Sequence, residues 1–304
     1  MKIYAFSCLL VLIILISGCS YIPDLGNFGG NTGGSDSKMG LIIDTFEPVI
    51  MQKYSAEPVA FRVKIKNTGS ETAFDVEARL TNIDEFQIYN QPTKRFQKIP
   101  PQTTTATGES PEVTWSWDLD APVVPKGTKV TFKPRMQIIY TYKTDTVRSI
   151  TVMPEIELRE YVDSGKPFPS DVVSKSTGPV SLDIDIKGPI AHYQSKITFP
   201  ISLTVQNIGG GTVCREECTD LDRDYNRVDL FLETYDVRLK DCELNNIRLT
   251  DDRATVVCNA EIDDSIFFGL IQMGTKQVTK KNIRFNIVYT YITDKVTTIE
   301  VVGK

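Results

Sequence analysis

A segment near the middle of the chain recurs at its C-terminal end. Residues 135–152, RMQIIYTYKTDTVRSITV, align without a gap to residues 284–301, RFNIVYTYITDKVTTIEV, and the two match at ten of 18 positions. Self-similarity over this length indicates a duplicated structural unit. The second half of the chain is therefore predicted to be a diverged copy of the first. Shorter matches precede both copies in the same order: residues 63–69 align with 203–209, and residues 127–129 with 274–276.

Short runs rich in Val, Ile, Thr, Phe and Tyr alternate with turn residues from residue 40 onward, which is typical of an all-β sandwich. At 304 residues the chain is long for one core and sufficient for two. We expect an all-β fold with two tandem immunoglobulin-like β-sandwich domains over residues 39–155 and 178–304. A linker over 156–177, with prolines and a polar run, is expected between them. The strands expected in the first half are residues 40–45, 59–66, 74–80, 113–119, 130–142 and 147–152.

The recurring segment alternates in the way of a strand with one buried face. We expect the aromatic face of each copy to lie in the core, with tyrosine hydroxyls bonded to backbone groups at the sandwich edge. The alternative is an exposed aromatic strip that binds a ligand. The pairs Thr144-Asp145 and Thr293-Asp294 are expected to form hairpin turns before return strands at 147–152 and 296–301. The two core faces comprise Met136, Ile138, Tyr140 and Tyr142, and Phe285, Ile287, Tyr289 and Tyr291.

The N-terminus is typical of an exported protein. Met1-Lys2 gives a positive start and Ile3–Ile16 is almost wholly apolar, a stretch too short to span a bilayer, so residues 1–18 are predicted to be a signal peptide. The run Leu15-Ile16-Ser17-Gly18-Cys19 resembles the lipobox of prokaryotic lipoproteins, which implies that Cys19 is lipidated and becomes the mature N-terminus. An ordinary signal peptide or a short anchor helix is the alternative. Residues 19–38, rich in Gly, Asn and Ser, are expected to be a flexible tether.

A second resemblance rests on strands and one turn. Each half has an extended run that ends in Asn-x-Gly, at Asn67-Thr68-Gly69 and Asn207-Ile208-Gly209, and in the first half an alternating strand at 74–80 follows. This pattern resembles the CARDB-like immunoglobulin-type domains of bacterial and archaeal surface proteins. The resemblance implies an extracellular sandwich used for adhesion, display or spacing. We expect the Asn and Gly residues to supply the positive φ angles that reverse the chain.

The cysteines beyond the N-terminal segment all lie in the second half, at Cys214, Cys218, Cys242 and Cys258. An even number in an exported domain predicts two disulfides. A four-thiolate zinc site is the alternative, but the spacing lacks the paired knuckles of such sites. Of the three possible pairings, we favour Cys214 with Cys218 and Cys242 with Cys258.

An insertion over residues 210–225 is the main departure between the halves. It carries Asp220, Asp222 and Asp224, and we regard this loop as the candidate binding site. Alternating oxygen side chains resemble a calcium loop, but the Gly at the sixth position is absent and Phe231 stands where a bidentate Glu is needed. The loop is therefore expected to be solvated and acidic, and no metal or cofactor is predicted.

The chain offers little for catalysis. His192 is the only histidine and stands in a loop that enters a strand, and no phosphate-cradling, HExxH or GxSxG motif occurs. The net charge of −5 and the scattered basic residues argue against nucleic acid as a partner.

The leading hypothesis is a non-enzymatic binding, adhesion or scaffold module, lipid-anchored on the extracytoplasmic face of the cell membrane. Its expected partner is another envelope or surface protein, or a glycan. The alternatives are an accessory subunit of an envelope-bound enzyme or transporter, and an enzyme with a carboxylate site on sandwich loops.

Overall fold

The computed structural model describes residues 40–89, 91–102, 110–168, 171–192, 196–215, 218–220, 223–263 and 278–304. The chain divides into two units, residues 1–35 and 36–304, and only the second contains described residues. The predicted signal peptide, the lipidation site Cys19, the tether and Asp222 lie outside the described residues. Within them, no helix has the length and apolarity needed to cross a membrane.

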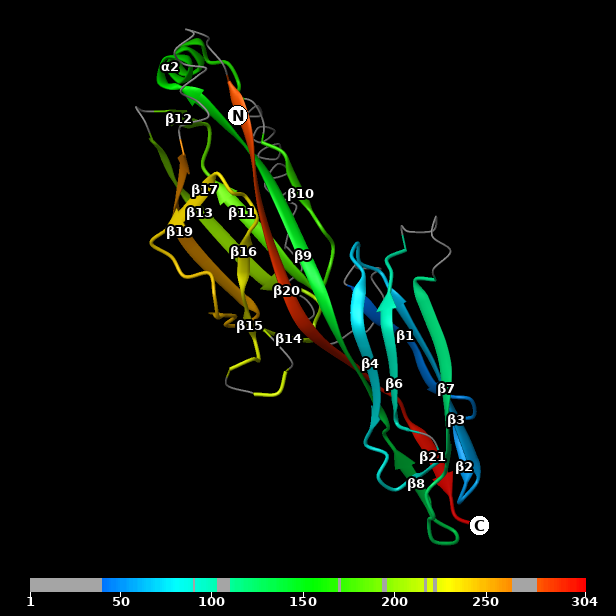
Figure 1. The fold of residues 1–304 in the computed structure, drawn as a ribbon. Coiled ribbons are helices and arrows are strands. Elements are labelled where there is room, and N and C mark those ends of the chain that lie inside the picture. Colours follow the sequence, from blue (N-terminus) through cyan, green and yellow to red (C-terminus); the bar gives the residue numbers. More distant parts are fainter. Residues whose placement is uncertain are drawn as a thin grey trace, which may run out of the picture. The chain divides into compact units, whose positions relative to one another are not determined.

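The fold is almost entirely β, as predicted, with several sheets (Figure 1). One four-stranded sheet has the order β1 (Leu41–Pro48), β3 (Pro58–Asn67), β7 (Glu112–Asp120), β5 (Gln87–Ile88). Its counterpart in the second half has the order β11 (Val180–Ile186), β13 (Lys196–Asn207), β19 (Arg253–Asp263), β17 (Val237–Lys240).

The largest sheet contains strands from both halves of the chain. Its main path has the order β14 (Thr212–Cys214), β20 (Thr279–Val296), β9 (Arg135–Pro154), β4 (Ala73–Thr81), β6 (Thr93–Ile99). Three short strands pair beside this path: β10 (Val173–Lys175) and β12 (Ile190–His192) with β9, and β16 (Leu230–Leu232) with β20.

Two small sheets complete the fold. In one, β21 (Ile299–Val302) lies between β2 (Gln52–Tyr54) and β8 (Lys129–Phe132), so the last strand of the second half pairs with two strands of the first. In the other, β15 (Arg227–Val228) pairs with β18 (Ile247–Arg248).

The two long strands β9 and β20 overturn the prediction of hairpins. Thr144-Asp145 lies inside β9 and Thr293-Asp294 lies inside β20, so neither pair forms a turn. β9 instead runs on for 20 residues, and its residues 135–152 pair antiparallel with the whole of β20, as the adjacent green and red strands of Figure 1 show. The aspartates fit an extended strand because each forms an ion pair across this ribbon, Asp145 with Arg284 and Asp294 with Arg135.

The alternating residues of the ribbon form the core face predicted from the sequence. Met136, Ile138, Phe285 and Ile287 are buried, as are the four tyrosines that follow them on the two strands. Strands of the facing sheets contribute Val63, Ile65, Leu203 and Val205, which are also fully buried. Each such aliphatic side chain stabilises the fold by about 1.5–3 kcal/mol relative to its exposure.

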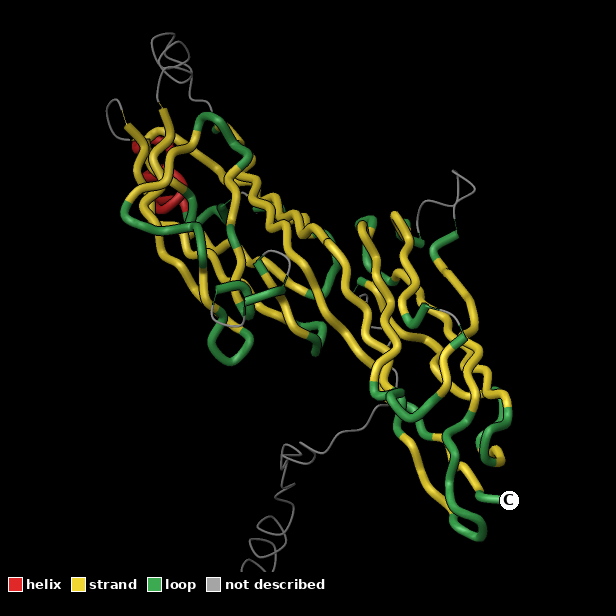
Figure 2. The backbone as a smooth tube through the Cα atoms, turned by 60° about the horizontal axis from the view of Figure 1, so that its bottom comes forward, coloured by secondary structure: helices red, strands yellow, loops and turns green. Residues whose placement is uncertain are grey.

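Residues 156–177, predicted as a linker, contain structure that the sequence analysis did not predict. Helix α2 (Glu155–Ser164), the red segment in Figure 2, starts after Pro154 and ends at Gly165 in the left-handed conformation. Glycine is favoured there because that conformation strains residues with a Cβ atom. α2 contains no buried residue, but β10 after it pairs with β9. The domain boundaries at 155 and 178 stay a prediction. The largest sheet contains strands from before residue 155 and from after residue 178.

Candidate functional site

Four tyrosines lie together at the centre of the paired strands β9 and β20, where these strands pass from one half of the chain to the other. Tyr142 lies opposite Tyr289 and Tyr140 lies opposite Tyr291 in the register of the two strands. Ring centroids of neighbours are 5.8–6.3 Å apart, and each residue is at most 1% exposed. We call these four residues the tyrosine cluster. Their burial confirms the prediction of core tyrosines and excludes the exposed aromatic strip.

The hydroxyls of the tyrosine cluster hold backbone groups at equivalent places in the two halves. The Tyr140 Oη accepts a bond from the N–H of Leu41, and the Tyr289 Oη accepts one from the N–H of Val180, both at 3.3 Å. These N–H groups belong to the first residues of the edge strands β1 and β11. The second tyrosine of each copy accepts a hydrogen bond from the turn between β3 and β4 in the first half and from the turn between β13 and β14 in the second. Tyr142 Oη accepts from the N–H of Glu71 at 3.1 Å, and Tyr291 Oη accepts from the N–H of Gly211 at 2.8 Å.

The glycine of each Asn-x-Gly motif leaves space for a tyrosine hydroxyl, and the asparagine holds the turn around it. The Asn67 amide donates to the Glu71 carbonyl, and the Asn207 amide donates to the Gly211 carbonyl, each at 2.8 Å. A Cβ atom on Gly69 would lie 1.9 Å from the Tyr142 Oη, and one on Gly209 would lie 2.4 Å from the Tyr291 Oη.

The expectation of positive φ holds only at Gly210, with φ 71°, directly after the second motif, and is wrong for the Asn and Gly residues of the motifs themselves. Gly69 and Gly209 lie outside the left-handed region, as do Asn67 and Asn207. Glycine is required because the tyrosine hydroxyl occupies the space that a Cβ atom would need. The reason for glycine is therefore this close contact and not a positive φ angle.

Burial further stabilises the neutral form of the tyrosine cluster. Loss of solvation raises the pKa of Tyr291 to about 12, and it raises the pKa of Tyr140, Tyr142 and Tyr289 in the same direction. A phenol with such a pKa exchanges no proton near neutral pH. The cluster therefore fixes the join between the halves and is unsuited to acid–base chemistry.

Charged side chains cover the other face of the ribbon. Arg284 lies 3.4 Å from an Asp145 carboxylate oxygen and 2.9 Å from a Glu233 carboxylate oxygen. Lys143 pairs with the same two carboxylates, at 3.1 Å and 3.4 Å. Nearby, desolvation and the charge of Asp145 raise the pKa of Glu71. Every charge named here has an opposite charge nearby, so the group forms a structural network between β9, β20 and the residue after β16.

The structure joins Cys214 to Cys218 and Cys242 to Cys258, which is the pairing favoured by the sequence. The second bond connects Cys242, two residues after β17, to the interior strand β19, and the two cysteines are 16 residues apart in the chain. In the chain-entropy account, a loop of this size stabilises the fold by about 3 kcal/mol. The first bond lies within the inserted loop and joins Cys218 to Cys214, the last residue of β14, which pairs with β20.

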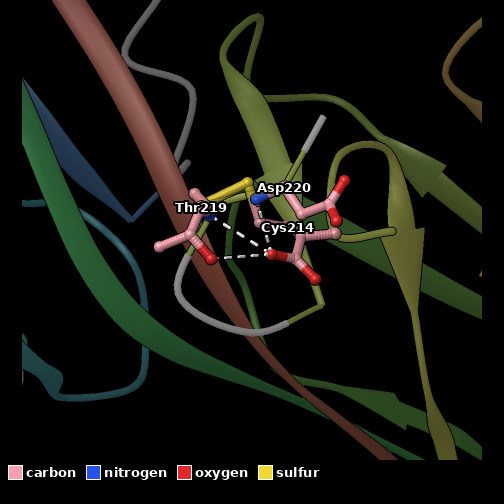
Figure 3. Close-up of a disulfide and its surroundings, with 5 residues drawn as sticks. Cys214, Thr219 and Asp220 are labelled. Atoms are coloured by element: carbon pink, nitrogen blue, oxygen red, sulfur yellow. Dashed lines mark hydrogen bonds between the residues drawn. A yellow bond between two sulfur atoms is a disulfide. The ribbon is translucent and has the colours of Figure 1, made fainter. Parts of the chain in front are cut away.

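The described carboxylates of the inserted loop bond to the loop itself (Figure 3). One oxygen of Asp224 accepts from the N–H of Asp220 at 3.0 Å and from the N–H and hydroxyl of Thr219 at 3.2 and 3.3 Å. The bond from the Asp220 N–H is the largest cause that lowers the pKa of Asp224. An Asp220 oxygen accepts from the N–H of Arg223 at 3.2 Å. The disulfide and these bonds join the described residues of the loop to one another.

Other predicted or missed features add little chemistry. His192 ends β12, and the structure does not describe its side chain. Among the described residues, no group of three or more His, Cys, Asp or Glu side chains is placed to hold a metal ion. A solvent-open hollow of about 450 Å³ borders β4 and β6, where Arg95 pairs with Glu77 at 2.9 Å beside Phe96. This hollow was not predicted, because β6 was not among the expected strands.

No protein-family model matches the chain, and no curated protein matches it. Among solved structures, the chain is similar to a secreted serine protease, VesC from Vibrio cholerae, at 8% identity and a TM-score of 0.21. The match covers 84% of this chain and 51% of the protease, so the chain spans about half the length of that protein. A likeness at this TM-score assigns neither a fold nor an activity to the chain.

Proposed function

We propose that the chain is a lipid-anchored module on the extracytoplasmic face of a prokaryotic cell membrane, where it binds or spaces another envelope component without catalysing a reaction. The observation that carries the proposal is the pairing of all four described cysteines in two disulfides. Disulfides persist in oxidising compartments outside the cytoplasm. The signal-peptide pattern and the lipobox ending in Cys19 agree with that compartment.

The polar groups described above bond strands to one another, which supports a role as a scaffold. The tyrosine hydroxyls, both Asn-x-Gly motifs and the paired charges around Asp145 all hold strands together. Strand pairing between the halves also resists bending better than two domains on a free linker, because separating them breaks a continuous ladder of backbone hydrogen bonds. The resemblance to CARDB-like domains favours the same use in adhesion or spacing.

Two variants test the anchor, Cys19→Ser and the matched control Cys8→Ser. Cys19 is the proposed acceptor of the lipid, whereas Cys8 lies inside the apolar segment that is removed. More than one acyl chain is needed for stable membrane attachment, so loss of the acceptor should release the protein or leave an unprocessed precursor. The measurement is the membrane-bound fraction together with the mass of the mature N-terminal peptide. Normal processing and membrane retention of Cys19→Ser would refute the proposal.

A further inference from the structure

The two repeats are related by a local two-fold axis at the centre of the β9–β20 ribbon. The sequence alignment matches Thr141 with Thr290, and the strand register places the same two residues opposite each other. On either side, Tyr140 aligns with Tyr289 but faces Tyr291. A two-fold axis produces this exchange, because each surface patch then meets its own equivalent.

The ion pairs of the ribbon obey the same symmetry. Arg135 binds Asp294, with nitrogen–oxygen distances of 2.9 and 2.8 Å. The aligned residues of the other copies, Arg284 and Asp145, approach within 3.4 Å. Both pairs join one half of the chain to the other.

The strand ends are exchanged symmetrically as well. In the second half, β21 runs parallel to β2, with Val301 opposite Lys53, and antiparallel to β8. In the first half, the aligned end of β9 runs parallel to β12 and antiparallel to the start of β20, with Val152 opposite both Ile190 and Thr279. Each half therefore completes the sheet of the other.

Side chains of the exchanged ends also bond carbonyl groups of the edge strand in the other half. Thr144 and Thr146 of β9 donate to the carbonyls of Val180 and Leu182 on β11, at 2.8 and 2.9 Å. From β20, the Lys295 ammonium donates to the carbonyls of Ile43 and Asp44 on β1, at 3.2 and 3.0 Å. The interface is thus an extended, reciprocal set of bonds.

We propose that the β9–β20 ribbon is a two-fold dimer interface carried within one chain, and that the two halves bind each other as separate polypeptides. The partner that this surface fits is a copy of the same repeat, here the other half of the chain. The covalent link between the halves runs through α2, which buries no residue, and both disulfides lie within the second half. Neither feature is needed to hold the interface together.

A cleavable chain tests the proposal. A recognition sequence for a site-specific protease is inserted after Lys166, which is exposed, and the folded protein is cut to completion. We expect both fragments to elute together from a sizing column at about 1 µM and at the position of the uncut protein, because a dimer interface of this extent binds at nanomolar to micromolar strength. Fragments that elute apart, or that precipitate on cutting, overturn the proposal.

A charge exchange tests the register in the same cut protein. Arg135→Asp and Asp294→Arg each replace an attraction across the interface by a repulsion, and each should weaken association by about threefold to tenfold. The double variant restores opposite charges and should recover the original affinity. Association that is unchanged in the single variants, or not recovered in the double variant, contradicts the proposed interface.

Discussion

Replacing Gly69 by alanine tests whether the tyrosine cluster sets the choice of glycine. The new Cβ atom would lie 1.9 Å from the Tyr142 Oη and 2.7 Å from the Thr177 carbonyl oxygen. Because the carbonyl belongs to the backbone, the tyrosine hydroxyl must move. It would then lose its bonds with the Glu71 N–H at 3.1 Å and the Thr177 carbonyl at 3.2 Å.

The expected cost combines two effects. Overpacking costs about 1–3 kcal/mol, and leaving the Glu71 N–H without a partner costs about 1–3 kcal/mol, whereas the Thr177 carbonyl keeps the bond from the N–H of Ser70 at 3.0 Å. We therefore expect Gly69→Ala to lower the free energy of unfolding by about 3 kcal/mol. Tyr142→Phe alone should cost about 1–2 kcal/mol, because it removes the same two hydrogen bonds without overpacking.

A double-mutant cycle separates this mechanism from a general effect of the substitution. Removing the hydroxyl relieves the closest clash, so Gly69→Ala with Tyr142→Phe should cost less than the sum of the single variants by about 1 kcal/mol or more. The assay is urea unfolding at equilibrium, followed by tryptophan fluorescence. Gly188→Ala is the control, since its new Cβ would come no nearer than 3.6 Å to the Asp171 carboxylate. Additive costs, or a Gly69→Ala variant as stable as the parent, would refute the reasoning.

Three further predictions concern the disulfides, the inserted loop and pH. Mass spectrometry before and after reduction should find four oxidised cysteines, and Cys242→Ser with Cys258→Ser should cost about 3 kcal/mol in unfolding experiments. Replacing residues 215–224 by a short connection, with Cys214→Ser and β14 retained, should leave a cooperatively melting protein that no longer captures its partners from membranes; unchanged capture would exclude the loop as the binding site. Stability should be complete below the pKa of an unfolded tyrosine, about 10, and fall as the pH rises toward about 12, the raised pKa of Tyr291. Absorbance at 295 nm that shows all tyrosines ionising near pH 10 in the folded protein would contradict their burial.

The sequence predicts the local features of this fold well. Alternation identifies the buried faces of β9 and β20, and the duplicated segment points to the strands that form the join. Asn67 and Gly69 signal a turn, but their reason is a contact with Tyr142, which is 73 residues beyond Gly69 in the chain. A local sequence pattern does not indicate which distant residue will lie beside it in the fold.

The hairpin prediction fails for the same reason. Thr144-Asp145 has turn-forming residue types, and only the partner strand decides whether the chain reverses or continues. Here Arg284 and the register with β20 favour an extended strand. Helix α2 could have been predicted, since Pro154 precedes an acidic first turn and Gly165 follows the last residue. The binding partner has no comparable signal in the residues described.

The pairing of β9 with β20, through which the two halves bind each other, is most directly measured by cross-linking at the centre of the ribbon. Thr141→Cys and Thr290→Cys place two thiols on directly opposed residues, whose Cβ atoms lie about 5 Å apart in such pairs. After cutting at the protease site behind Lys166, a short thiol-specific cross-linker should keep the two fragments joined on a denaturing gel. Thr141→Cys with Asn282→Cys is the control, because Asn282 pairs with Ser149, about 27 Å along the ribbon. Cross-linking of the opposed pair alone is the predicted result, and fragments that separate in both variants would contradict the pairing of the two halves.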